Sequence, residues 1–198
     1  MTVDRRETLR YMRMGSVQEL DPMFESRLSC VEGEVAAAAR PAHCSLAVPV
    51  ARGEGSYCVG PLRLESAALL RELEGCDEAF LFCATLGAGV DALLRRYGAK
   101  SAADLVMGQA AATALLESYC DGCCEALAES VRKEGRGDGL SMRFSPGYGD
   151  LPLDVQRPLF AALDVPRKIG VSLTDSLLMA PSKSVSAIIG ISQRAFTP

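Results

Sequence analysis

Residues 143–150 read Arg-Phe-Ser-Pro-Gly-Tyr-Gly-Asp, and residues 181–186 read Pro-Ser-Lys-Ser-Val-Ser before a hydrophobic segment. An arginine followed at fixed spacing by a Gly-Tyr turn suits recognition of a small zwitterion. The guanidinium fork can grip a carboxylate, and Gly147 lets the backbone approach the ligand closely. The plainer alternative is a surface arginine beside an ordinary Pro-Gly turn. Taken alone, the segment 143–150 is therefore consistent with a ligand-binding turn and with an ordinary surface turn.

Composition favours one soluble globular domain. The chain has 198 residues, 48% of them hydrophobic, which predicts a single domain over residues 1–198 with a helical N-terminal extension over residues 1–45. The net charge of -4 and the scattered basic residues argue against nucleic acid as a partner. Positive charge near the N-terminus is followed by no apolar core, and the apolar runs are short for a membrane span. We expect a cytoplasmic protein that does not bind membranes.

Eight cysteines and one histidine limit the chemistry. Without a secretion signal, the cysteines are expected to be reduced thiols. His43 alone excludes a site built from several imidazoles, and we expect it at the surface or as a cap. Cys120-x-x-Cys123-Cys124 could bind a metal or form a redox pair on a helix. Since Cys120 and Cys123 fall on an apolar stripe and no second Cys-x-x-Cys follows, we favour core packing and predict no metal site.

Helical and strand-like segments alternate only partly along the chain. This favours an α+β fold with a mixed or antiparallel twisted sheet flanked by helices. Pro49 would confine the first strand to a sheet edge, and Pro158 either kinks its helix or lies in the first turn. The predicted helices are 22–39, 65–73, a short one through Leu93, 101–134 and 155–163, and the predicted strands are 45–50, 79–84, 140–144, 171–173 and 184–191, with a turn at 53–56.

Gly87-Ala-Gly89 follows a hydrophobic strand, as a nucleotide-binding turn would. The segment is too short for Gly-x-Gly-x-x-Gly, and no acidic residue lies about twenty positions further on at the end of a second strand. A plain connection between strand and helix is the favoured interpretation.

Arg143-x-x-x-Gly-Tyr148, together with the sequence around it, resembles the S-adenosylmethionine-binding signature of the activation domain of cobalamin-dependent methionine synthase. The continuation Gly149-Asp-Leu-Pro152-Leu and the later Leu173-Thr-Asp-Ser176 and Pro181-x-x-Ser184-Val-Ser186 occur in the order and rough spacing of that family. The resemblance is firmest over residues 140–191 and looser over 60–134. It implies the activation domain fold in a stand-alone form.

The resemblance also implies roles for particular residues. Arg143 would hold the carboxylate of S-adenosylmethionine, and Tyr148 with the Gly147 backbone would contact the sulfonium end. Glu117 is the best match to an acidic residue on the family's long helix, and would hold the amino group; its alternative is a solvated helix glutamate. Catalytic side chains are not expected.

Ser184 and Ser186 belong to the segment that lines the ligand cleft in this family. They alternate with Val185 and Ala187, so both hydroxyls point to one side of a strand. The alternative is a half-exposed strand whose serines face water. This chain departs from the family at Gly149, where proline is usual, which predicts a looser turn. It also lacks the histidine that follows the acidic residue in the long enzymes.

By resemblance, the protein is a reactivation module. It would supply S-adenosylmethionine for the reductive methylation of cob(II)alamin, with an electron from a flavodoxin-like or other low-potential donor. The chain lacks the Asp-x-His-x-x-Gly pattern that ligates cobalamin, so a separate methionine synthase chain would hold that cofactor. Two other interpretations stay open: a non-catalytic interaction module for corrinoid proteins that has lost S-adenosylmethionine, and a thiol-based redox or metal protein centred on Cys120 to Cys124.

Overall fold

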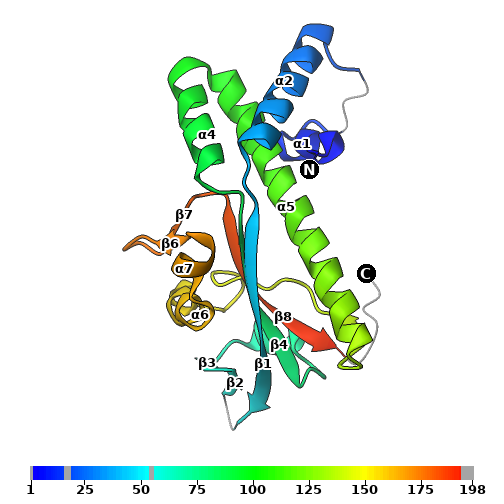
Figure 1. The fold of residues 1–198 in the computed structure, drawn as a ribbon, viewed down its shortest axis with the longest axis vertical. Helices are drawn as coiled ribbons and strands as arrows, with labels where there is room; N and C mark the ends of the chain where they lie inside the picture. The colour runs from blue at the N-terminus through cyan, green and yellow to red at the C-terminus, as the bar shows by residue number, and fades with distance from the viewer. Residues whose placement is uncertain (1, 16–18, 54–55, 193–198) are drawn as a thin grey trace. The chain divides into compact units, whose positions relative to one another are not determined.

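Helices and a six-stranded sheet make up the fold in the computed structural model, which describes residues 2–15, 19–53 and 56–192 (Figure 1). The helices are α1 (Arg5–Tyr11), α2 (Pro22–Ala38), α3 (Ala67–Glu72), α4 (Ala88–Lys100), α5 (Ala102–Lys133), the 3₁₀ turn η1 (Leu153–Val155), α6 (Gln156–Leu163) and α7 (Val165–Ile169). The strands are β1 (Ala42–Arg52), β2 (Tyr57–Val59), β3 (Leu62–Leu64), β4 (Glu78–Thr85), β5 (Gly139–Leu140), β6 (Ser172–Leu173), β7 (Met179–Ala180) and β8 (Ser184–Ser192).

Two compact units are built from alternating pieces of the chain. The first unit is Met1–Ala42, Thr85–Asp121 and Ala180–Ser184, and the second is His43–Ala84, Gly122–Met179 and Val185–Pro198. Helix α5 contributes its N-terminal part to the first unit and its C-terminal part to the second. This division does not test the single domain predicted over residues 1–198, which stays a prediction. The predicted N-terminal extension contains helices α1 and α2, and β1 begins at Ala42.

The sheet has the strand order β3-β2-β1-β4-β8-β5, and β6 pairs with β7 in a separate two-stranded sheet. The pairings of β1 with β2, β2 with β3 and β5 with β8 are antiparallel. Together with the surrounding helices this confirms the predicted α+β class. The edge position predicted for the first strand is wrong, because β1 lies between β2 and β4. Pro49 is tolerated there because the β1–β2 register begins one residue later, at Val50.

In the second unit, one apolar core joins the sheet to the helices α3, α6 and α7. Strand β4 is an almost continuous hydrophobic run, Glu-Ala-Phe-Leu-Phe-Cys-Ala-Thr, and is buried from Ala79 onward. A strand of this kind is typical of a sheet that is covered on both faces. The core residues shared by helix and sheet include Leu69, Leu81, Leu159, Leu163 and Ile188.

Helix α5 was predicted over 101–134 and is observed over Ala102–Lys133. Ser101 accepts a hydrogen bond from the Asp104 amide at 3.2 Å, as the capping motif predicts. The apolar stripe predicted on this helix consists of Leu116, Cys120, Cys123, Leu127 and Val131. All are buried except Leu127, which is half-exposed. None of the helices in the described part of the chain combines the length and the apolar character that a membrane crossing needs.

Polar pairs join helices within the first unit. Arg27 of α2 donates two hydrogen bonds to Asp104 of α5, at 2.8 and 2.7 Å. The Tyr97 hydroxyl of α4 donates to Glu34 of α2 at 2.9 Å. Burial, followed by the hydrogen bond to Glu34, raises the pKa of Tyr97 above its ordinary value. These bonds join α2 to α4 and to the N-terminal part of α5 within the first unit.

Two other sequence predictions change in detail. The strand predicted over 140–144 is reduced to Gly139–Leu140 and a bridge from Phe144 to Ile188, because the Ser141 hydroxyl accepts the Gly190 amide at 2.8 Å and interrupts the ladder. Pro158 lies in the first turn of α6 rather than at a kink. The turn predicted at 53–56 includes residues 54 and 55, which are outside the described residues.

Candidate functional site

The Arg-x-x-x-Gly-Tyr segment folds into a tight turn anchored on the sheet of the second unit. Phe144 exchanges two backbone hydrogen bonds with Ile188 of β8, at 3.0 and 2.9 Å. Beyond this anchor, the Gly147 amide donates to the Leu151 carbonyl at 2.8 Å, and the Tyr148 amide donates to the Ser145 carbonyl at 3.1 Å. Gly147 has a φ of 91°, which disfavours residues with a side chain. The glycine in the motif is therefore required by the backbone itself.

The turn presents its ligand-binding candidates to solvent. Gly147 is exposed, and the Tyr148 side chain is 70% exposed. A large aromatic side chain at the tip of an ordered turn contributes little to the core, so its position suits contact with a ligand or a partner.

Arg143 lies at the start of this turn and is half-buried. One of its terminal nitrogens lies 3.7 Å from the Cys124 sulfur, in the part of α5 that belongs to the second unit. Sulfur is a weak acceptor, and the guanidinium stays charged and carries five N–H donors. Arg143 is thus a half-buried cation at the start of an exposed, glycine-containing turn, a position that suits a carboxylate ligand.

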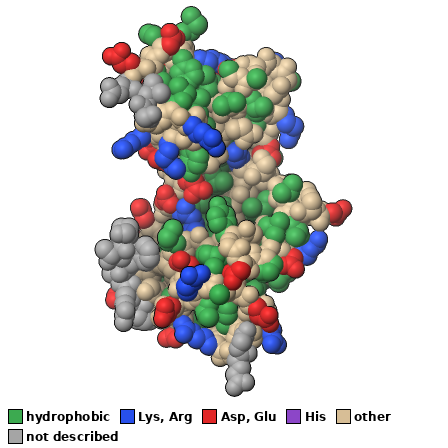
Figure 2. Space-filling model, turned by 180° about the vertical axis from the view of Figure 1, so that it is seen from behind, with side chains coloured by type: hydrophobic (Ala, Val, Ile, Leu, Met, Phe, Trp, Pro, Cys, Tyr) green, Lys and Arg blue, Asp and Glu red, His purple; other side chains and the backbone are tan. Residues whose placement is uncertain are grey.

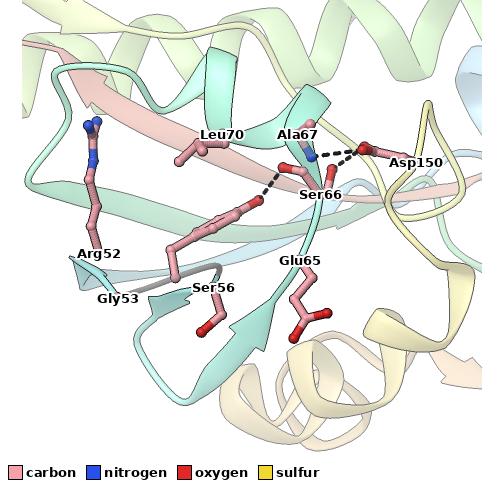
Figure 3. A pocket seen from close by; sticks show the side chains of 9 residues that line it. Arg52, Gly53, Ser56, Glu65, Ser66, Ala67, Leu70 and Asp150 are labelled. Atoms are coloured by element: carbon pink, nitrogen blue, oxygen red, sulfur yellow. Dashed lines mark hydrogen bonds between the residues drawn. The ribbon is translucent and has the colours of Figure 1, made fainter.

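The turn ends in a carboxylate contact that the sequence did not reveal. Asp150 accepts hydrogen bonds from the Ser66 hydroxyl at 2.5 Å and from the Ala67 amide at 2.7 Å (Figure 3). It also accepts a hydrogen bond from the Ala68 amide at 3.1 Å. The Ser66 bond, then those from Ala68 and Ala67, lower the pKa of the Asp150 carboxyl below its ordinary value. Asp150 thereby binds the N-terminus of helix α3.

Gly149 stands where proline is usual in the family, and the looser turn predicted from this difference stays a prediction. The φ of Gly149, 55°, lies in the left-handed region, which proline cannot adopt. A Cβ atom on Gly149 would lie 3.1 Å from the Cβ of Ala68, so the turn packs directly on helix α3. Glycine at this position therefore permits both the close contact with α3 and the left-handed conformation.

Ser184 and the residues before it are fixed within the first unit. The Ser184 hydroxyl lies 2.8 Å from the Thr85 hydroxyl and 2.7 Å from the Pro181 carbonyl oxygen. Asp91 of α4 accepts from the Ser182 amide at 2.7 Å and from its hydroxyl at 2.9 Å. The Lys183 ammonium donates to the Thr113 hydroxyl of α5 at 2.9 Å, and burial lowers the pKa of Lys183. The segment 181–184 is therefore rigidly held.

The six predicted binding residues fall into two groups. Arg143, Gly147 and Tyr148 lie together on the turn of the second unit, and Ser186 lies on β8 of the same unit. Glu117, half-buried on α5, and Ser184 belong to the first unit. The two serines are 8% and 2% exposed, so the water-facing alternative for them is wrong. The binding roles of all six residues stay predictions.

The cysteine-rich part of α5 packs as a set of small hydrophobic residues would. Cys120 and Cys123 are buried, and the Cys123 sulfur lies 3.4 Å from Nδ1 of His43. His43 is exposed and stacks on Phe82, with ring centroids 6.1 Å apart. Among the residues that the structure describes, no three His, Cys, Asp or Glu side chains form a group that could hold a metal ion.

The two glycines that suggested a nucleotide-binding turn are explained by contacts within the first unit. Gly87 has a φ of 82°, and its amide donates to the Thr85 hydroxyl at 3.0 Å. A Cβ on Gly89 would lie 2.4 Å from the Ala38 carbonyl oxygen, so the start of α4 needs glycine to approach the end of α2. Thr85–Gly89 is a connection between strand and helix, as the sequence favoured.

Comparison with known proteins places these features in a family. Residues 70–196 match the family model for the vitamin B12 dependent methionine synthase activation domain. The chain belongs to this family. The match includes the turn at 143–150 and the segment 181–186. No curated protein sequence matches the chain.

A solved structure extends the likeness over nearly the whole of this chain. It is the crystal structure of the MetH reactivation domain bound to AdoHcy, with a TM-score of 0.69 and 16% sequence identity. The similarity covers 97% of this chain and 75% of that chain. The predicted activation domain-like fold is therefore confirmed. At this level of identity, the comparison establishes the fold, while the family model establishes the family.

Proposed function

We propose that this protein binds S-adenosylmethionine and serves as a reactivation module for a cobalamin-dependent methionine synthase on a separate chain. The observation that carries the proposal is the family match over residues 70–196, which contains both the exposed Arg143–Tyr148 turn and the Pro181–Ser186 segment. The fold of a reactivation domain bound to AdoHcy supports the choice of ligand class. On this proposal the protein is an accessory component that acts in trans.

The residues of the turn fit the amino-acid end of the proposed ligand. Arg143, a half-buried residue, would bind the carboxylate through its guanidinium. Gly147 and Tyr148 would face the sulfonium end, where a backbone without Cβ and an exposed aromatic ring suit a cationic group. Glu117 would bind the amino group, and Ser184 and Ser186 would line the cleft.

The chain needs little chemistry of its own for this function. S-adenosylmethionine, when bound, supplies the methyl group, and the partner's cobalamin receives it, with an electron from a flavodoxin-like or other low-potential donor. The protein has to bind and orient the donor and exclude water, and no general acid or base is required. This agrees with a chain whose one histidine, His43, is exposed.

Surface charge is compatible with a protein or small-molecule partner. Figure 2 shows Lys and Arg side chains scattered among Asp and Glu over the face in view. A continuous basic stripe, which nucleic acid requires, does not appear on that face of the described residues.

Calorimetric titration with S-adenosylmethionine tests the proposal. The parent protein should bind, and Arg143→Ala should weaken binding by about 30-fold or more, because loss of a charge-assisted pair costs roughly 2 to 5 kcal/mol. Arg132→Ala, which removes an exposed arginine of α5, is the matched control and should bind like the parent. A folded parent protein that does not bind S-adenosylmethionine would favour the non-catalytic interaction module instead.

A further inference from the structure

The exposed Gly147–Tyr148 turn is held at both ends by elements of the second unit. On its N-terminal side Phe144 is bonded to β8, and on its C-terminal side Asp150 is bonded to helix α3. Between these anchors the turn contains two glycines with positive φ, Gly147 and Gly149. Glycines have the largest conformational freedom of all residues, so an exposed turn of this composition depends on its anchors for order.

Ser66, the hydrogen-bond partner of Asp150, is itself held in place by other contacts. Ser66 is 2% exposed, and its hydroxyl also accepts the Leu69 amide at 3.1 Å, as an N-cap of α3. The Ser66 carbonyl accepts the Tyr57 hydroxyl at 3.0 Å in a buried contact. Figure 3 shows Asp150 directed at Ser66 and the start of α3. Both residues line a cavity of about 450 Å³. The carboxylate is therefore fixed by a buried serine and two helix amides, and Tyr57 of β2 holds that serine in turn.

We propose that Asp150 is a positioning residue that holds the Gly147–Tyr148 turn in its ligand-binding conformation. The ligand part of this inference rests on the proposed function. Asp150 does not have to touch the ligand: its three hydrogen bonds fix the C-terminal end of the turn two residues after Tyr148, and Gly149 packs on Ala68 of the same helix. The turn is then ordered before the ligand arrives, which removes part of the entropy cost of binding.

Asp150→Asn is the variant of choice because it keeps the size of the side chain. The carboxamide can accept through only one of its two terminal atoms, so the hydrogen bond from either the Ala67 or the Ala68 amide is lost, and the charge-assisted bonds become neutral. Asp154→Asn is the matched control, since Asp154 is an exposed carboxylate on η1 four residues further along. Ser66→Ala removes one of the three donors to Asp150, together with the N-cap bond to Leu69, and leaves the sequence of the turn unchanged.

Limited chymotrypsin cleavage after Tyr148 measures the order of the turn without any ligand. Asp150→Asn should raise that cleavage rate by about tenfold, because the rate follows the population of the open form. Ser66→Ala should raise it less, and Asp154→Asn should leave it at the parent rate. Circular dichroism of each variant checks that the sheet and helices are retained. Cleavage of Asp150→Asn at the parent rate would overturn the proposal.

Titration with S-adenosylmethionine supplies the second readout. Asp150→Asn should raise the Kd by about two- to tenfold, the range expected when one flexible segment must be ordered on binding. An unchanged Kd in a variant whose turn is cleaved faster would refute the role toward the ligand. If the parent protein does not bind at all, the proposed function fails, whereas the cleavage comparison still decides whether Asp150 orders the turn.

Discussion

The substitution Gly149→Ala tests the close packing of the binding turn on helix α3. Gly149 has a φ of 55°, and a Cβ atom added there would lie 3.1 Å from the Cβ of Ala68. The left-handed conformation costs an alanine roughly 1 to 2 kcal/mol. The contact should add about 1 kcal/mol, the low end of the usual cost of overpacking, because a shift of a few tenths of an ångström relieves it.

Gly75→Ala separates these two contributions. Gly75 also belongs to the second unit and has a φ of 75°, but a Cβ there would meet no atom within 4 Å. Gly75→Ala therefore reports the backbone cost alone. Combining Gly149→Ala with Ala68→Gly should remove the steric contact, so the double variant should be about 1 kcal/mol more stable than additivity predicts.

Urea unfolding followed by far-UV circular dichroism gives the free energy of unfolding of each variant. Gly149→Ala should lose more stability than Gly75→Ala, and the cycle with Ala68→Gly should show the coupling. If the two glycine variants lose the same free energy, and the cycle is additive within about 0.3 kcal/mol, then the turn does not pack on helix α3 as described.

Other contacts give three further predictions. Cys123→Ala should lower the free energy of unfolding by about 1 to 2 kcal/mol as a small core truncation, with unchanged S-adenosylmethionine affinity; stoichiometric zinc or iron in the purified parent would contradict it. Arg27 lowers the pKa of Asp104 in the folded protein. The ion pair therefore stabilises the folded state fully above the unfolded-state pKa of about 3.9, and this stability is lost as the pH falls through the lowered folded-state pKa. At acid pH, Tm should fall less steeply with decreasing pH in Asp104→Asn than in the parent protein. The same steepness in both proteins would show that the Arg27–Asp104 pair does not contribute. Glu117→Gln and Tyr148→Phe should slow reactivation less than Arg143→Ala, since each leaves the carboxylate contact in place; equal losses in all three would count against that ranking.

Local sequence patterns predicted the positions of several helices correctly. The spacing of apolar residues between Leu116 and Val131, with Ser101 as a cap, predicted α5 to within a residue at each end. Asp21-Pro22 likewise marked the start of α2. Strand order was not accessible in this way. Pro49 suggested an edge strand, yet β1 lies inside the sheet, with Pro49 just before the pairing with β2 begins. The neighbours of a strand depend on contacts between residues far apart in the sequence, which local patterns do not reveal.

For the candidate site too, the sequence identified the residues of a local motif but not a contact between distant residues. The motif itself identified Arg143, Gly147 and Tyr148, and the structure places them on one anchored turn. Asp150 was visible in the sequence only as the residue after Gly149. Its partner Ser66 lies 84 positions earlier, so nothing local could connect the two. The available signals were a serine before a short helix and an aspartate without an assigned role after a Gly-Tyr turn.

Reactivation in trans is the decisive test of the proposed function. Methionine synthase that lacks its activation domain, inactivated by oxidation to cob(II)alamin, is incubated with a low-potential reductant, S-adenosylmethionine and this protein, and the recovered turnover is measured. We expect recovery that requires both S-adenosylmethionine and this protein, and that is largely lost with Arg143→Ala. The absence of recovery with folded parent protein, under conditions where an intact methionine synthase is reactivated, would contradict the proposed function.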